Sequence, residues 1–261
     1  MKKYISLYQK LIKLNIARLM EYRANFINSV ISDLGWGTFS ILMMVILTSK
    51  TTTVFGWSRV ELLILSGCVN IFFGIFRSIF SSNFETIGVS AKFGKLDSLL
   101  IKPVNSQFLI SLTYINPTGF LRVILGSVFV SYLLFVNHIS ISPISIVFFI
   151  LFLLMGIILL YAFCFSILTL TIWFPDLTNI IGLLYAVDST VRYPQEMYRT
   201  MGSFFFLVLP LTFVVVPAVQ VLLGKARVED VIGSIFFTVV FLLFSMFFWH
   251  YALRSYTSVS S

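Results

Sequence analysis

Residues 144–172 read ISIVFFILFLLMGIILLYAFCFSILTLTI and contain no charged side chain. A helix that crosses the hydrocarbon core of a bilayer, which is about 30 Å thick, needs about 20 consecutive apolar residues. This stretch exceeds that length, and a helix can satisfy all of its backbone polar groups internally. It therefore predicts a membrane-spanning α-helix in the second half of the chain.

The composition of the whole chain excludes a water-soluble globule. Of its 261 residues, 59% are hydrophobic and 11% are charged, whereas soluble domains carry about 25% charged residues. The two cysteines, Cys68 and Cys164, lie inside apolar runs, so we expect neither a disulfide framework nor a metal site. The net charge of +8 comes without a basic and aromatic groove pattern, so we expect no nucleic-acid partner.

Further long apolar segments predict an all-α integral membrane protein with six transmembrane helices. We expect these helices at about residues 26–49, 60–82, 107–136, 144–172, 177–192 and 229–253. The region 178–224 allows two divisions, because polar residues interrupt its middle. In the first, 178–192 is a short span and a re-entrant outer hairpin follows at 195–224, broken at Pro210 and Pro217. In the second, 200–223 is the span.

Loop charges predict which side of the membrane holds the termini, since six crossings put both on one side. That side carries nine basic residues: Lys2, Lys3, Lys10, Lys13, Arg18, Arg23, Lys92, Lys95 and Lys102. The opposite side carries four, or six if the outer segment is re-entrant: Lys50, Arg59, Lys225 and Arg227, then Arg192 and Arg199. Because cytoplasmic loops are enriched in Lys and Arg, we expect cytoplasmic N- and C-termini.

The N-terminal arm interleaves apolar and basic side chains. We expect residues 1–25 to form a basic amphipathic helix that lies in the cytoplasmic membrane interface. Two roles are open for this helix: anchoring to anionic lipid, or contact with a gate or a partner. Lys10 and Lys13 interrupt the first apolar run, so we expect no cleavable signal peptide.

Catalytic and nucleotide-binding motifs are missing from the sequence, so we do not expect the chain itself to be an enzyme. The two histidines, His138 and His250, have no nucleophile or carboxylate at a supporting spacing. The nearest approach to a P-loop, at residues 88–96, has one residue too many and places Leu96 where Ser or Thr belongs. Active transport would therefore take its energy from a partner or from an ion gradient.

Ionisable residues inside the predicted spans are costly and indicate pairing or function. Asp33 and Arg77 lie at similar depths from the same side, so we expect an intramembrane ion pair between them. Arg122 could snorkel, pair or face a cavity, and Asp188 could pair locally with Arg192. The sequence leaves these alternatives open.

The loop at residues 84–106 contains a short amphipathic segment. Residues 95–101 can form two helical turns that end before Pro103, since the residue before proline avoids the helical region. A helix of this length is too short to cross the membrane and suits docking into a groove of a partner. The alternative is a loop that only lies in the interface.

Several short motifs make nearly the whole chain resemble a known family. They are Gly94-Lys-Leu-Asp97-Ser-Leu-Leu-Ile-Lys102-Pro103-Val-Asn105, Arg192-Tyr193-Pro194, Leu209-Pro210-Leu-Thr-Phe, Pro217-Ala218 and Leu222-Leu223-Gly224. With them, the chain resembles the membrane permease subunits of bacterial ABC exporters of the type 2 permease class, in a six-span subgroup without a fused ATPase domain.

The resemblance implies roles for particular segments. It makes residues 1–25 an interfacial connecting helix and the 84–106 loop a coupling segment. The expected contacts with an ATPase are Gly94, Leu96, Asp97, Leu99, Leu100, Lys102 and Pro103. The residues expected in outer re-entrant helices, which cap the transport path, are Tyr193, Pro194, Pro210, Pro217 and Gly224.

The resemblance also implies a complex in the bacterial cytoplasmic membrane. Its other members would be two cytosolic ABC ATPase subunits, which bind ATP and Mg²⁺, and a second permease, identical or related. The chain itself would bind no cofactor directly and would export a hydrophobic or amphipathic compound. The alternatives are a gradient-driven transporter and a non-transporting scaffold or immunity protein, neither of which would have an ATPase partner.

Overall fold

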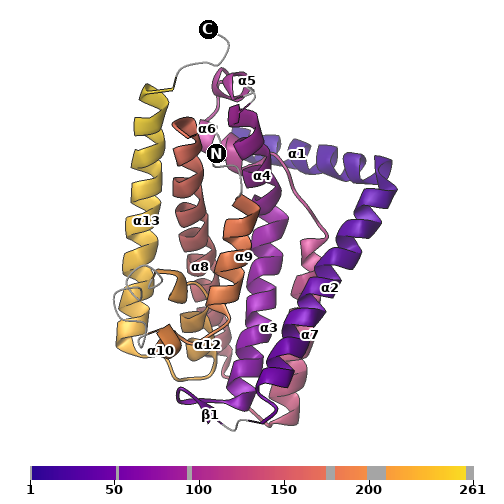
Figure 1. Ribbon diagram of the computed structural model, residues 1–261, viewed down its shortest axis with the longest axis vertical. Coiled ribbons are helices and arrows are strands. Elements are labelled where there is room, and N and C mark those ends of the chain that lie inside the picture. The colour runs from indigo at the N-terminus through magenta and orange to yellow at the C-terminus, as the bar shows by residue number, and fades with distance from the viewer. Residues whose placement is uncertain (1, 51–52, 93–95, 175–179, 199–209, 257–261) are drawn as a thin grey trace.

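A computed structural model describes residues 2–50, 53–92, 96–174, 180–198 and 210–256 of the chain, which form a helical bundle with one small hairpin (Figure 1). The long helices are α1 (Lys2–Glu21), α2 (Arg23–Leu47), α3 (Arg59–Phe76), α4 (Ser82–Lys92), α7 (Gly119–Val136), α8 (Pro143–Thr169) and α13 (Val228–Arg254). The shorter elements are β1 (Thr53–Val54), β2 (Trp57–Ser58), η1 (Arg77–Ser81), α5 (Asp97–Leu100), α6 (Ser106–Leu112), η2 (Leu170–Ile172), α9 (Ile180–Val191), α10 (Gln195–Tyr198) and α12 (Val216–Leu222).

The described residues contain five helical segments that are long and apolar enough to cross a membrane. They are Arg23–Leu47, Arg59–Ile87, Gly119–Val136, Pro143–Ile172 and Val228–Arg254. The chain is therefore an all-α membrane protein. Of the six expected spans, the one at 177–192 corresponds to α9, whose 12 residues extend only about 18 Å. The rival span at 200–223 falls partly outside the described residues, and Pro210–Leu222 is a shorter apolar helix.

The expected span at residues 107–136 is divided between α6 and α7. Pro117 has no backbone N–H and disfavours the helical conformation at Asn116. The freed backbone groups find a partner in Asn83 of α4. Its Nδ2 donates to the carbonyl oxygen of Tyr114 at 2.8 Å, and its Oδ1 accepts from the Tyr114 amide at 2.8 Å. The break is thus a fixed part of the fold.

The expected loop at residues 84–106 begins later than predicted, because α4 continues to Lys92. The π-helical turn η1 joins α3 to α4 without an interruption. Gly88 lies inside α4, and a single glycine within a helix costs only about 1 kcal/mol. As a result, the second span and the first part of the expected loop form one long rod (Figure 1).

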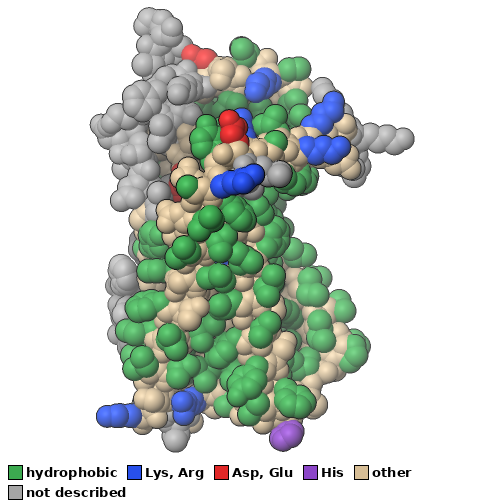
Figure 2. Space-filling view, turned by 90° about the vertical axis from the view of Figure 1, so that its right-hand side faces the viewer, with side chains coloured by type: hydrophobic (Ala, Val, Ile, Leu, Met, Phe, Trp, Pro, Cys, Tyr) green, Lys and Arg blue, Asp and Glu red, His purple; other side chains and the backbone are tan. Residues whose placement is uncertain are grey.

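The two ends of the bundle differ in their elements (Figure 1). At the α1 end, α1 runs across the bundle beside α5 and α6, and at the hairpin end lie the β1–β2 hairpin, α10 and α12. Asn15 Nδ2 donates to the Thr113 carbonyl oxygen at 2.9 Å, and the Arg18 guanidinium lies 5.6 Å from the Tyr114 ring centre. These contacts hold α1 against the segment after α6. Figure 2 shows a broad hydrophobic band between the two ends, each of which carries Lys or Arg side chains.

The central helix α3 is buried along most of its length and packs closely against α7. A Cβ atom added to Gly74 of α3 would lie 2.8 Å from the Gly119 carbonyl oxygen of α7. A Cβ atom on Gly126 would lie 2.6 Å from the Gly67 carbonyl oxygen. Small residues allow such close backbone approach, which favours helix association inside a bilayer.

On the other side of α3, α8 packs through aromatic and aliphatic side chains. The rings of Phe84 and Phe165 lie 6.4 Å apart, and those of Phe165 and Trp249 lie 5.3 Å apart in an edge-on arrangement. These contacts connect α4, α8 and α13. The bundle therefore has one core that runs from α7 through α3 and α8 to α13.

Candidate functional site

Two clusters of charged side chains lie inside the bundle, and the first joins α2 to η1. Arg77 Nε lies 3.7 Å from Asp33 Oδ1, and the Arg77 side chain is 32% exposed. Thr118, in the turn before α7, donates its hydroxyl to Asp33 Oδ2 at 2.6 Å. The buried Asp33 carboxylate thus has one charged and one neutral partner, which reduces the cost of its burial.

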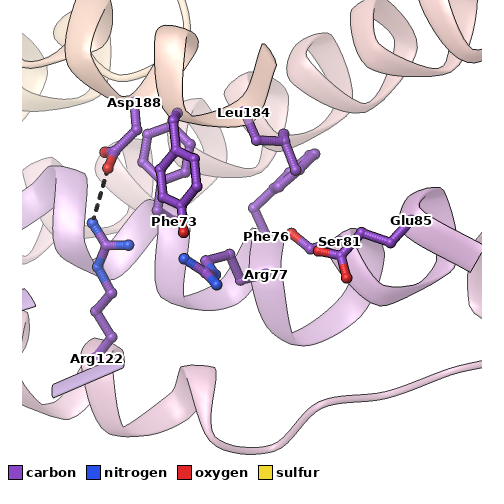
Figure 3. A pocket seen from close by; sticks show the side chains of 9 residues that line it. Phe73, Phe76, Arg77, Ser81, Glu85, Arg122, Leu184 and Asp188 are labelled. Atoms are coloured by element: carbon purple, nitrogen blue, oxygen red, sulfur yellow. Dashed lines mark hydrogen bonds and ion pairs between the residues drawn. The ribbon is translucent and has the colours of Figure 1, made fainter. Parts of the chain in front are cut away.

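The second cluster centres on Asp188 of α9. Its Oδ2 accepts from Arg192 Nη2 at 2.6 Å and from Trp36 Nε1 at 3.0 Å, and lies 3.5 Å from Arg122 Nη2. Arg122 is 1% exposed, and its Nε donates to Asn70 Oδ1 at 2.8 Å. Figure 3 shows how the guanidinium from α7 reaches the carboxylate of α9. One carboxylate therefore links α9 to α2, α3 and α7.

A small cavity is lined by residues of both clusters, among them Arg77, Arg122 and Asp188 (Figure 3). Its volume is about 20 Å³, which is room for about one water molecule. Asp188 Oδ1 and the Ser81 hydroxyl are buried, line this cavity, and lack a hydrogen-bond partner within the described ranges. A drug-sized compound does not fit in this cavity.

The structure brings together more residues here than the sequence indicated. Arg122 and Asp188 were left open by sequence reasoning, and Trp36 and Asn70 were missed. Asn70 carried a usable signal, because an amide in the middle of an apolar span needs a polar partner. Trp36 carried none, because an indole in a span is equally suited to lipid contact.

The expected ATPase-contact residues that the structure describes lie within α5 or directly beside it in the chain, and α5 is at the α1 end (Figure 1). α5 is a single turn, Asp97–Leu100, rather than two turns over residues 95–101. Leu96 is 2% exposed, so its side chain is an anchor of α5 and not an available contact surface. Gly94 lies outside the described residues.

The remaining expected contacts divide into supporting and exposed side chains. Leu99 and Leu100 are half-buried and pack against the core. Lys102 and Pro103 are exposed, and Ile101 between α5 and Lys102 is 84% exposed. The projecting surface is therefore the turn at Ile101, Lys102 and Pro103, which we call the α5 tip.

The C-terminal end of α13 lies against α5 and α6. Trp249 Nε1 donates to the Ser106 hydroxyl at 3.0 Å. Burial, and then the nearby Asp97 carboxylate, raise the pKa of the Tyr256 phenol. The Trp249 hydrogen bond therefore joins α13 to the first residue of α6, which follows the α5 tip in the chain.

The residues expected in outer re-entrant helices are at the hairpin end as far as the structure describes them. Pro194, Pro210 and Pro217 are buried, Tyr193 is half-buried, and Gly224 is exposed with φ +69°. The expected hairpin at 195–224 includes residues 199–209, which lie outside the described residues.

The described residues contain no group of three or more His, Cys, Asp or Glu side chains that could hold a metal ion. Cys68 and Cys164 are free and buried. The charged side chains of the interior therefore contact one another and neighbouring polar groups.

Comparison with known proteins gives the family of the chain. The family described as ABC-2 family transporter protein matches residues 34–260. Neither the curated proteins nor the solved structures gave a match. The family match extends from within α2 to beyond α13, begins one residue after Asp33, and includes Arg77, the Asp188 cluster and the α5 tip. The chain therefore belongs to the ABC-2 transporter family and is an ABC-2 type membrane permease.

Proposed function

We propose that the chain is the permease subunit of an ATP-driven exporter and that the α5 tip docks onto a separate ATPase subunit. The observation that carries this proposal is Ile101, which directly follows α5 at the α1 end of the bundle (Figure 1) and is 84% exposed. An apolar side chain that projects from a short surface helix suits a groove in a partner protein. Lys102 and Pro103 extend the same surface.

The complex that we propose has two ATPase subunits and two permeases, the second identical or related to this chain. ATP and Mg²⁺ bind to the ATPase subunits. The complex lies in a bacterial cytoplasmic membrane, with the α1 end on the cytoplasmic side. The nine basic residues predicted on that side, against four to six on the other, support this orientation.

The path from the α5 tip to the interior suggests how docking acts on the bundle. α4, η1 and α3 form one rod, and Asn83 of α4 is bonded to the segment before α7. Movement of the tip would therefore reach Arg77 and, through α7, Arg122. If ATP binding by the partner favours a second arrangement of these charge pairs, the cavity between them opens to a hydrophobic or amphipathic substrate.

A gradient-driven carrier is the second candidate function. The buried carboxylates of Asp33 and Asp188 favour it, because ionisable residues inside membrane proteins are common in proton and ion pathways. Such a carrier would not need an ATPase partner, so the two candidates differ in one measurable property.

The test is purification of the chain from its native cell in mild detergent, followed by identification of bound proteins and an ATPase assay. We expect the wild-type chain to recover an ATPase subunit, and Ile101→Asp to lose it while remaining folded. The matched control is Val228→Asp, which changes an equally accessible apolar residue, 74% exposed, at the hairpin end. It should recover the ATPase normally.

The outcomes separate the two parts of the proposal. Wild-type chain that recovers no ATPase and shows no ATP hydrolysis would overturn the exporter function and favour the gradient-driven carrier. Wild-type recovery together with normal recovery by Ile101→Asp would retain the exporter and overturn the assignment of the α5 tip.

A further inference from the structure

A second cavity lies at the hairpin end, far from the charge clusters and the α5 tip. It has a volume of about 100 Å³. Its walls come from the turn between β1 and β2, the first turn of α3, α10, α12 and the segment before α13. Three separate stretches of the chain, residues 55–61, residue 196 and residues 220–227, thus converge on one space that is large enough for a small headgroup or several water molecules.

Two hydrogen-bond acceptors in this cavity are unused. Glu196 Oε2 and Gln220 Oε1 are buried without a partner within the described ranges, and Gln220 is 5% exposed as a residue. Buried acceptors are almost always paired in folded proteins, since an unpaired one loses its hydration without replacement. Because Glu196 and Gln220 both line the same cavity, a ligand whose N–H or O–H donors reach the two oxygens would satisfy them together.

In contrast to Glu196, the other carboxylate that lines the cavity, Glu61, has partners for both of its oxygens. Glu61 Oε2 accepts from the Ser58 backbone amide at 3.0 Å, within a capping box at the start of α3. Glu61 Oε1 accepts from the Lys225 ammonium. Glu61 and Lys225 therefore neutralise each other, and Glu196 is the acid of the cavity lining that has no ion pair among the described residues.

The lining also contains an unneutralised base. Arg227 is exposed, and the ion pairs of the described residues do not include it. The cavity therefore presents a free negative group with an acceptor beside it, Glu196 and Gln220, and a free positive group, Arg227. A bare divalent cation suits this lining poorly, because Glu61 is already paired with Lys225 and Arg227 would repel the cation.

We propose that this cavity binds a small zwitterion, with a primary ammonium group donating to Glu196 and Gln220 and an anionic group paired with Arg227. The anionic group is a carboxylate or a phosphate, both of which match a guanidinium. Two sources carry this chemistry: a soluble amino acid, and the headgroup of an ethanolamine phospholipid. A trimethylated ammonium has the same charge but no N–H donors, so it leaves both acceptors unpaired.

The test uses the full chain in nanodiscs made of phosphatidylcholine and phosphatidylglycerol, with thermal unfolding as the readout. The soluble probes are phosphoethanolamine and glycine, and their matched controls are phosphocholine and glycine betaine, which differ only in methylation of the nitrogen. We expect a saturable rise in the unfolding temperature with at least one primary amine and none with the methylated controls. Equal responses to amine and methylated control would overturn the proposal.

The lipid source is tested by replacing phosphatidylcholine with phosphatidylethanolamine in the nanodisc. A rise in unfolding temperature with this lipid and with phosphoethanolamine, but not with glycine, assigns the site to a lipid headgroup. A rise with glycine alone assigns it to a soluble amino acid. No response to any primary amine means that the cavity holds water only and overturns the proposal.

Variants separate binding from folding. Gln220→Met removes an unpaired acceptor at similar volume, so the ligand-free protein should be no less stable while its ligand-induced shift is lost. Glu196→Gln keeps the shape and removes the charge, and should raise the apparent dissociation constant roughly tenfold. Glu229→Gln, an exposed acid at the same end that does not line the cavity, is the control and should bind as wild type. Wild-type binding by both Gln220→Met and Glu196→Gln would overturn the assignment.

Discussion

The two sides of the bundle are held together by different interactions. On one side, α2, α3, α7 and α9 share the buried charges of Asp33, Arg122 and Asp188. On the other side, α8 has no charged residue between Pro143 and Thr169, and α13 has acidic and basic residues only in its first and last turns. The first side is therefore specified by charge pairs and the second by the shape of apolar and aromatic side chains.

The two sides differ in this way because both lie in lipid rather than in water. In lipid, apolar helices gain little hydrophobic stabilisation from one another, so a pair such as α8 and α13 depends on fitted surfaces. A buried charge that loses its partner cannot be hydrated by water instead, so the pair fixes the relative position of its two helices strongly. We infer that the charged side determines the register of the helices and that the apolar side tolerates more variation.

The largest effect should come from Arg122→Met. Asp188 would keep Arg192 and Trp36, but Asn70 Oδ1 would lose its shorter hydrogen bond and keep only the Ser40 hydroxyl at 3.3 Å, and α7 would lose its link to α9. We expect the free energy of unfolding in mixed micelles to fall by about 3 kcal/mol. Arg18→Met at the exposed end of α1 is the control and should cost less than about 1 kcal/mol. Similar losses in both variants would contradict the view that charge specifies this side.

The next effect should come from Gly74→Ala on the same side. The new methyl group would lie 2.8 Å from the Gly119 carbonyl oxygen and 2.7 Å from Val123 Cγ2, so α3 and α7 must separate. We expect a loss of about 2 kcal/mol, measured by the same unfolding titration. At Gly35 nothing lies within 4 Å of the added methyl group, so Gly35→Ala should not destabilise. A neutral result at Gly74 would mean that shape matters little where charges are present.

A charge exchange tests the Asp33 and Arg77 pair by itself. Each single change, Asp33→Arg or Arg77→Asp, places like charges together and should destabilise the bundle. The double change should recover about 1 kcal/mol relative to the sum of the singles, a modest value because Arg77 is 32% exposed. A double-mutant cycle provides the measurement, and strictly additive losses would show that the two residues do not interact.

The smallest effect should come from the lipid-facing surface of the apolar side. Phe247 of α13 is 73% exposed, and Phe247→Leu should change the free energy of unfolding by no more than about 0.5 kcal/mol. The same variant should be assayed for recovery of other membrane subunits. If it loses a second permease that the wild-type chain recovers, then this face of α13 is a subunit interface and not a lipid-facing surface.

Much of the fold could be predicted because membrane helices are long and uniform. The spans around residues 26–49, 60–82, 144–172 and 229–253 correspond closely to helical segments of the structure. The family resemblance is confirmed by the match over residues 34–260. At the interruption before α7, only the structure showed that Asn83 pairs with the backbone groups of Tyr114, because these residues are far apart in the chain.

Of the two charge clusters, the sequence predicted the Asp33 and Arg77 pair but not the contact between Arg122 and Asp188. Asp33 and Arg77 were paired because depth in a span can be counted along a helix. Arg122 lies in α7 and Asp188 in the short helix α9, and these helices are not consecutive in the chain. Counting residues along a helix could therefore not show that the two side chains meet. The α5 tip was located in outline, but only the structure separated buried Leu96 from exposed Ile101.

By itself, the sequence determined that the protein lies in a membrane, where four of its spanning helices are, and which family it resembles. These depend on composition and on local periodicity, which each segment carries without reference to the others. Only the tertiary structure decided which charges meet, which small residues touch, and which acceptors at Glu196 and Gln220 are left without a partner. The physical reason is that a hydrogen bond or an ion pair depends on distances of a few ångströms between segments that are far apart in the chain.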